Sequence, residues 1–147
     1  MTKKVKSSKK KFVPQIYMAP YMNIAYGLFA NREDLDEVLV ANNIPTYLFN
    51  TDAIPYAGTM RGVYDNNPDG ITRRYAFVYA EKVFNDDTLD EPRRLSYIVH
   101  EAYHVVAHMI HEMGEVNPSE EFIAYTLNEV ADNLFQEYYR WKEAHSG

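Results

Sequence analysis

The chain has 147 residues, of which 46% are hydrophobic and 14% aromatic, and a formal net charge of −6. This length and composition predict one globular domain rather than a disordered chain. Cysteine is absent, which excludes disulfides, zinc ribbons, iron–sulfur ligation and cysteine nucleophiles. We find no apolar run of about 18 residues and no secretory signal, so we expect a cytoplasmic protein without a membrane partner.

The first 12 residues are predicted to form a basic, flexible tail ahead of a single domain at 13–147. Residues 1–11 contain six lysines and no acid, whereas the rest of the chain has nine basic and 21 acidic side chains, a balance of −12. Lysine tails bind nucleic acid or anionic membranes weakly. Because no arginine or aromatic residue alternates with these lysines, we expect no specific nucleic-acid binding.

The first half of the domain reads as short strands around one helix. Residues 15–30 are rich in tyrosine, isoleucine and phenylalanine, which predicts extended chain with a strand in the second half. Residues 31–43 predict a helix capped by Asn31, with an apolar stripe of Leu35, Val38 and Leu39. "TYLFN", after Pro45, is a strand candidate.

A predicted hairpin and two long helices follow. "GTMRGVYD" and "ITRRYAFVYAEKV" flank the turn "NNPDG", which places Gly70 in the left-handed position. A 3.6-residue period then predicts a helix from about Glu91 to Gly114, capped by Asp90. A second helix, capped by Ser119, is expected to run to about residue 142. The expected fold is α+β, a small antiparallel or mixed sheet followed by two long helices.

Four of the five histidines lie on the first of these helices, within "HEAYHVVAHMIH". On a wheel with His100 at 0°, His100, His104, His108 and His111 fall at about 0–80° and Glu101 at about 100°, opposite the apolar face. Such a stripe is either an exposed polar face or a metal site. His-Glu-x-x-His in mid-helix favours the metal, because two imidazoles one turn apart share a zinc ion at about 2.0–2.1 Å.

Such a site needs a third ligand. The longer metalloprotease pattern has histidine six residues after the second histidine, where this chain has Ile110, and His108 and His111 cannot easily wrap round the same ion. The second helix carries a polar stripe at helical spacing, and we expect it to face the histidine stripe across the ion. That polar stripe comprises Glu121, Tyr125, Asn128 and Asp132.

The segment "HEAYHVVAHMIHEMG…SEEFIAYTL" resembles small phage-encoded zinc-dependent peptidases, a gluzincin-like group of zincins. The shared motifs are His-Glu-Ala-x-His, a helix-ending glycine about ten residues later and Glu-x-x-Ala-Tyr, within residues 95–134. The resemblance implies a minimal zincin fold in the host cytoplasm, with His100, His104 and Glu121 as Zn²⁺ ligands and Glu101 as the catalytic base. "NEVAD" is one residue short of the larger gluzincins' motif, which makes Glu129 the second choice for third ligand.

The expected activity is therefore zinc-dependent hydrolysis of peptide or amide bonds in a peptide or protein substrate, including a host protein. Tyr125 is the candidate donor to the oxyanion, and its alternative role is packing in an aromatic-rich core. Asp132 is a candidate to orient a ligand histidine. An extended peptide is expected to add to a free edge at residues 71–83.

Two other functions fit the same residues. One is a non-catalytic phage-type binding or inhibitor protein, with a structural or vestigial zinc site and an acidic interaction surface. The other is a zinc amidohydrolase that acts on something other than a peptide.

Overall fold

The computed structural model describes residues 11–19, 23–65 and 67–146, so nearly all of the predicted lysine tail lies outside the described residues. The elements, in chain order, are β1 (Tyr17–Met18), β2 (Ile24–Phe29), α1 (Arg32–Ala41), the 3₁₀ helix η1 (Thr46–Leu48), β3 (Gly58–Tyr64), β4 (Arg73–Tyr79), α2 (Glu81–Asn85), α3 (Glu91–Glu112) and α4 (Glu120–His145).

The strands form one mixed sheet in the order β1-β2-β4-β3. β2 and β4 are parallel, and the other two pairs are antiparallel. The α+β class and the small mixed sheet are confirmed. The edge strands are β1 and β3, and not β4 as the sequence suggested, because β4 is hydrogen-bonded on both sides.

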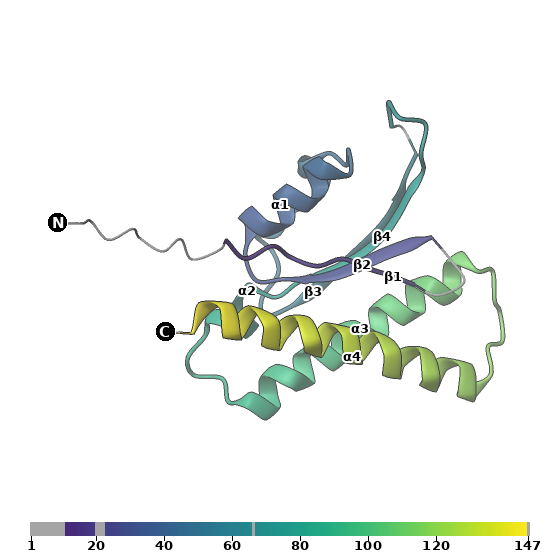
Figure 1. The fold of residues 1–147 in the computed structure, drawn as a ribbon. Coiled ribbons are helices and arrows are strands. Elements are labelled where there is room, and N and C mark those ends of the chain that lie inside the picture. The colour runs from purple at the N-terminus through teal and green to yellow at the C-terminus, as the bar shows by residue number, and fades with distance from the viewer. Residues whose placement is uncertain (1–10, 20–22, 66, 147) are drawn as a thin grey trace.

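Helices cover both faces of the sheet (Figure 1). The face toward α3 and α4 holds the larger core cluster, which includes Tyr26, Ala76, Val78, Ile98 and Leu134. The opposite face packs on α1 through a second cluster. Because side chains alternate along a strand, Arg74, Ala76 and Val78 of β4 face α3, while Tyr75 and Phe77 face α1.

Local sequence signals explain most element boundaries. Asn31, Asp90 and Ser119 each accept a hydrogen bond from a backbone N–H in the first turn of the following helix. Gly70 and Gly114 have φ of +73° and +71°, the left-handed conformation expected of a hairpin turn and of a residue just past a helix. These predicted caps and turns are confirmed.

Two predicted strands are wrong or too long. The segment 46–50 is not a strand: Thr46–Leu48 form η1, and the guanidinium of Arg32 donates hydrogen bonds to the carbonyls of Thr46 and Phe49, which favours a turn here. The predicted strand at 71–83 ends at Tyr79, and its last residues form α2.

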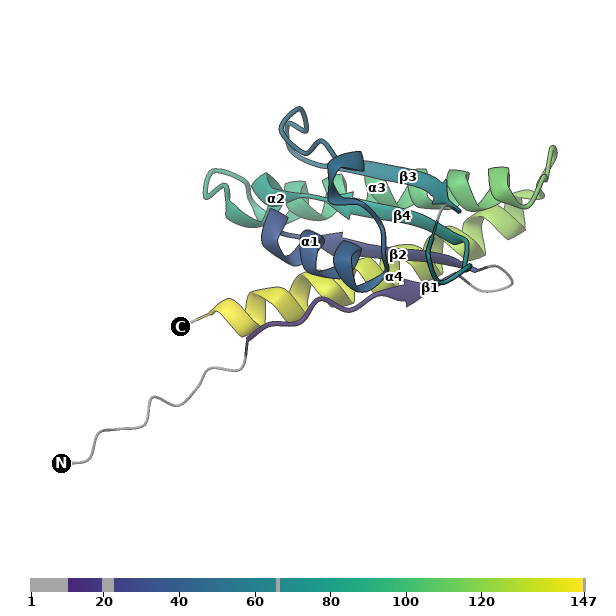
Figure 2. The ribbon, with the colours of Figure 1, turned by 90° about the horizontal axis from the view of Figure 1, so that it is seen from above.

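The two long helices lie side by side on one face of the sheet (Figure 2). α3 packs on β3 and β4, whereas α4 packs on β2. One side of α3 therefore borders β3 at the sheet edge, and its opposite side borders α4. No helix within the described residues is long and apolar enough to cross a membrane.

Candidate functional site

Glu101 is a buried carboxylate at the contact between α3 and the edge strand. The residue is only 5% exposed. Its Oε1 accepts a hydrogen bond of 2.8 Å from Oγ1 of Thr59, in β3. Thr59 shares strand parity with Arg61 and Val63, so all three lie on the side of β3 that faces α3. Burial and this bond give Glu101 a defined position rather than a solvated one.

His100 and His104 lie on the outer side of α3, next to Glu101. Their Nε2 atoms are 3.3 Å apart. Two nitrogens bound to one tetrahedral zinc ion at about 2.0–2.1 Å stand about 3.3–3.4 Å from each other, so the pair fits the ion. Oε2 of Glu101 lies 4.0 Å from Nε2 of His100, which places a carboxylate oxygen beside the pair.

The predicted histidine stripe is not exposed throughout. His111 is exposed, but His108 is only 6% exposed, and its Nε2 has no hydrogen-bond partner among the described residues. β3 runs along the side of α3 that carries Glu101, and the same strand covers His108. Burial lowers the pKa of His108, while the nearby Glu112 carboxylate acts in the opposite direction.

Glu121 is not brought to the histidine pair. It is exposed in the first turn of α4, and Asp132 and Tyr125 (72% exposed) also lie on the solvent side of that helix. The polar stripe of α4 points away from the sheet rather than toward the histidines. Within the described residues, no three histidine or acidic side chains are grouped closely enough to hold a metal ion.

The register of the two antiparallel helices shows how far Glu121 lies from the pair. The Glu91 carboxylate, at the start of α3, accepts hydrogen bonds from the hydroxyls of Tyr138 and Tyr139. Because both helices rise equally per residue, each step forward from Glu91 along α3 corresponds to one step back from Tyr138 along α4. This register puts Tyr125 roughly level with His104, and Glu121 roughly one turn beyond it. Tyr125 thus occupies the right level, but its side chain is in solvent and not in the aromatic core.

Glu129 lies on the far flank of α4. Burial of the Tyr26 hydroxyl is the main cause of the raised pKa of Tyr26, and a hydrogen bond from Asn133 lowers this pKa. The charge of Glu129 raises it further, which places Glu129 near Tyr26. Tyr26 belongs to β2, which β4 separates from β3. Because the histidine pair is on the β3 side of α3, Glu129 is not brought to it either.

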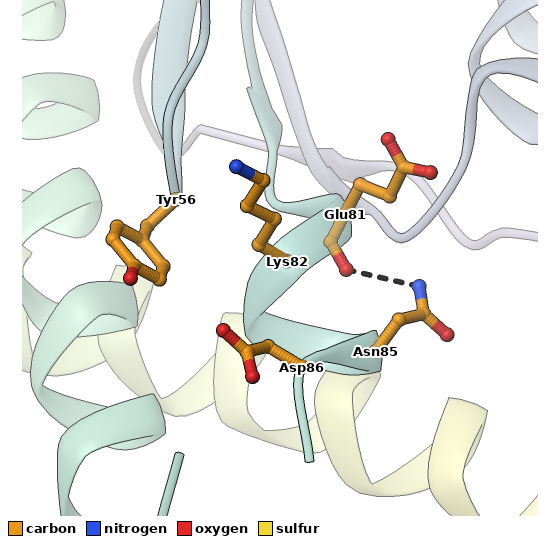
Figure 3. A pocket seen from close by; sticks show the side chains of 5 residues that line it. All are labelled: Tyr56, Glu81, Lys82, Asn85 and Asp86. Atoms are coloured by element: carbon orange, nitrogen blue, oxygen red, sulfur yellow. Dashed lines mark hydrogen bonds between the residues drawn. The ribbon is translucent and has the colours of Figure 1, made fainter. Parts of the chain in front are cut away.

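Two cavities lie near α3, one between Tyr56 and α2 and the other between β3 and α3. One, of about 330 Å³, is lined by Tyr56, Glu81, Lys82, Asn85 and Asp86 (Figure 3). The ring of Tyr56 stacks on that of Tyr97, one turn before Glu101, at 5.0 Å. The other cavity, of about 470 Å³, includes Arg61 of β3 and His108 of α3.

Sequence reasoning missed Thr59 and Arg61. Their two-residue spacing on a predicted strand places both side chains on one face, but nothing in the sequence indicates which helix that face packs against.

Comparison of the chain with protein-family models, with curated protein sequences and with solved structures gave no match.

Proposed function

We propose that this protein is a zinc-dependent hydrolase that cleaves peptide or amide bonds. The observation that carries the proposal is the 3.3 Å separation of Nε2 of His100 from Nε2 of His104, beside the buried carboxylate of Glu101. Two imidazoles at this spacing match two corners of a zinc tetrahedron. The resemblance of the same segment to small phage-encoded zinc-dependent peptidases, acting in the host cytoplasm, belongs to this proposal.

The residues of the chain divide the work between them. His100 and His104 would hold the ion, which supplies Lewis acidity and lowers the pKa of water toward 7 when bound. Glu101 takes the proton from the attacking water and passes it to the leaving amine. Thr59 keeps the carboxylate turned so that one oxygen is held and the other faces the histidines.

The third ligand comes from α4, and Glu121 is the acid we assign to it. The competing Glu129 sits near Tyr26 on the flank away from β3. Glu121 lies in the exposed first turn of its helix, so binding the ion would require this end of α4 to move toward the β3 side of α3. Tyr125, level with His104, remains our candidate donor to the oxyanion.

The free edge of β3 suits an extended substrate. Its outward N–H and C=O groups have no strand partner in the sheet, and an added peptide strand would satisfy them. Thr59 lies on this strand, so a peptide paired with β3 passes directly over the Glu101 carboxylate.

Metal analysis tests the proposal directly. Protein purified without a histidine tag is expected to hold about one zinc per chain, measured by elemental analysis after gel filtration. His104→Ala should remove the ion, whereas the matched control His145→Ala, near the end of α4, should keep it. Zinc-free wild type after zinc-supplemented expression, or a zinc-loaded His104→Ala, would reject the metal site.

A further inference from the structure

The larger cavity beside the proposed active site combines a cationic side chain with a buried imidazole. Arg61 is exposed on β3 and makes no hydrogen bond or ion pair with another described residue. Across the cavity, His108 is buried and its Nε2 has no partner in the described part of the chain. A buried polar atom without a partner costs free energy unless a ligand supplies one.

Counted together with Arg74, which lies outside its lining, the cavity carries one net positive charge. Its one acid, Glu112, has Oε1 3.4 Å from Nε of Arg74, so a neighbouring arginine already balances that carboxylate. Among the residues that the structure describes, no such partner balances Arg61. This local positive charge contrasts with the acidic balance of the chain from residue 12 onward.

We propose that the cavity between β3 and the C-terminal half of α3 is a substrate subsite for a carboxylate, bound by Arg61 and His108. A guanidinium offers two parallel N–H groups to the two oxygens of a carboxylate. The unpartnered Nε2 of His108 lies on the buried side of the cavity, where the protonated ring would supply a further donor. The cavity, at about 470 Å³, has the volume usual for a small-ligand site.

A carboxylate subsite would make the proposed hydrolase selective for substrates with an acidic group, and this role rests on the proposed function. Arg61 is two residues after Thr59 on the edge strand, so the carboxylate site lies a short distance along β3 from Glu101. A peptide that pairs with β3 would place an acidic side chain, or its own C-terminal carboxylate, in the cavity at a fixed distance from the bond cut.

Binding is tested first, without any need for activity. The full chain, labelled with ¹⁵N, is titrated with N-acetylglutamate α-amide, which carries a side-chain carboxylate, and with N-acetylglycine, which carries a main-chain carboxylate. N-acetylglutamine α-amide is the neutral control. We expect saturable shifts of the His108 ring and Gly62 amide signals with at least one carboxylate, and none with the amide. Whichever carboxylate binds more tightly identifies its source.

Arg61→Gln should weaken this binding by about tenfold or more, since an interaction with a charged group is lost. Arg93→Gln, at another exposed arginine without a side-chain partner in the described residues, is the matched control and should leave it unchanged. The absence of shifts up to about 50 mM carboxylate, or equal binding by Arg61→Gln, would overturn the subsite. Tighter binding of inorganic phosphate would overturn its assignment to carboxylates.

Cleavage of a mixed peptide library distinguishes failure of this inference from failure of the proposed function. Wild type should prefer an acidic residue, or a free C-terminus, at one fixed position from the cut. Arg61→Glu should reverse that preference toward lysine and arginine, an effect that loss of structure does not produce. Cleavage without such a preference removes the subsite and keeps the hydrolase. Carboxylate binding without any cleavage keeps the subsite and removes the hydrolase.

Discussion

Thr59 donates a hydrogen bond of 2.8 Å to Oε1 of Glu101 and so links the edge strand of the sheet to the centre of the histidine helix. The two residues are 42 positions apart in the chain. Because Glu101 is buried, this bond satisfies an oxygen that would otherwise lose its water without replacement. The free oxygen of the same carboxylate remains beside His100.

Thr59→Val should impair both stability and activity while preserving side-chain shape. Loss of a hydrogen bond to a buried charged group costs about 1.5–3 kcal/mol, so we expect a lower urea midpoint and a kcat/KM reduced by roughly tenfold or more. Thr59→Ser keeps the hydroxyl and should retain most of both. Equal behaviour of the valine and serine variants would show that the bond does not position Glu101.

Glu101→Gln separates an enzyme from a binding protein with a structural metal. The amide preserves volume but cannot accept a proton, so hydrolysis should fall by orders of magnitude while zinc content stays near one per chain. A binding or inhibitor protein would keep its biological effect. The measurement is any assay of that effect, with zinc content determined in parallel. Full effect from zinc-loaded Glu101→Gln would end the hydrolase proposal.

The third ligand is tested by removing one α4 acid at a time. Glu121→Ala should weaken zinc affinity by at least about tenfold, because it removes a direct ligand. Glu129→Ala should change it little, since that side chain lies toward Tyr26 on the other flank of α4. Competition with a chromogenic chelator measures both constants. A larger loss at Glu129 would reverse the assignment.

Glu137 should make stability depend on pH. It is 1% exposed, and burial raises its pKa above 4.5, although hydrogen bonds from Arg140 and the Gln15 N–H act in the other direction. The folded state therefore holds this proton more tightly than the unfolded state. Its contribution to stability is complete below about pH 4.5 and is lost as the pH rises through the folded pKa.

Glu137→Gln removes this titration and should gain stability relative to wild type between about pH 4 and pH 7. Urea unfolding at both pH values gives the difference. Glu143→Gln, an exposed acid on the same helix, controls for the loss of one negative charge. A constant difference between Glu137→Gln and wild type at the two pH values would contradict the prediction.

The sequence by itself determined the local features of this fold. Asn31, Asp90 and Ser119 begin the three main helices because a side-chain oxygen next to free backbone N–H groups acts within one turn. Gly70 and Gly114 mark the hairpin turn and the helix end for an equally local reason. The spacing of His100 and His104 on one side of a helix also follows from helical geometry alone.

Tertiary structure decided which of these features meet. The wheel placed His108 opposite the apolar face, but β3 covers it, because strand order rather than helical period determines what lies beside a helix. The turn at 46–49 depends on Arg32, a residue 14 positions before Thr46. The contact of Thr59 with Glu101, and the cavity that joins Arg61 to His108, depend on strand and helix packing across long sequence separations. Such contacts are set by burial of the whole core and not by any nearby residue pattern.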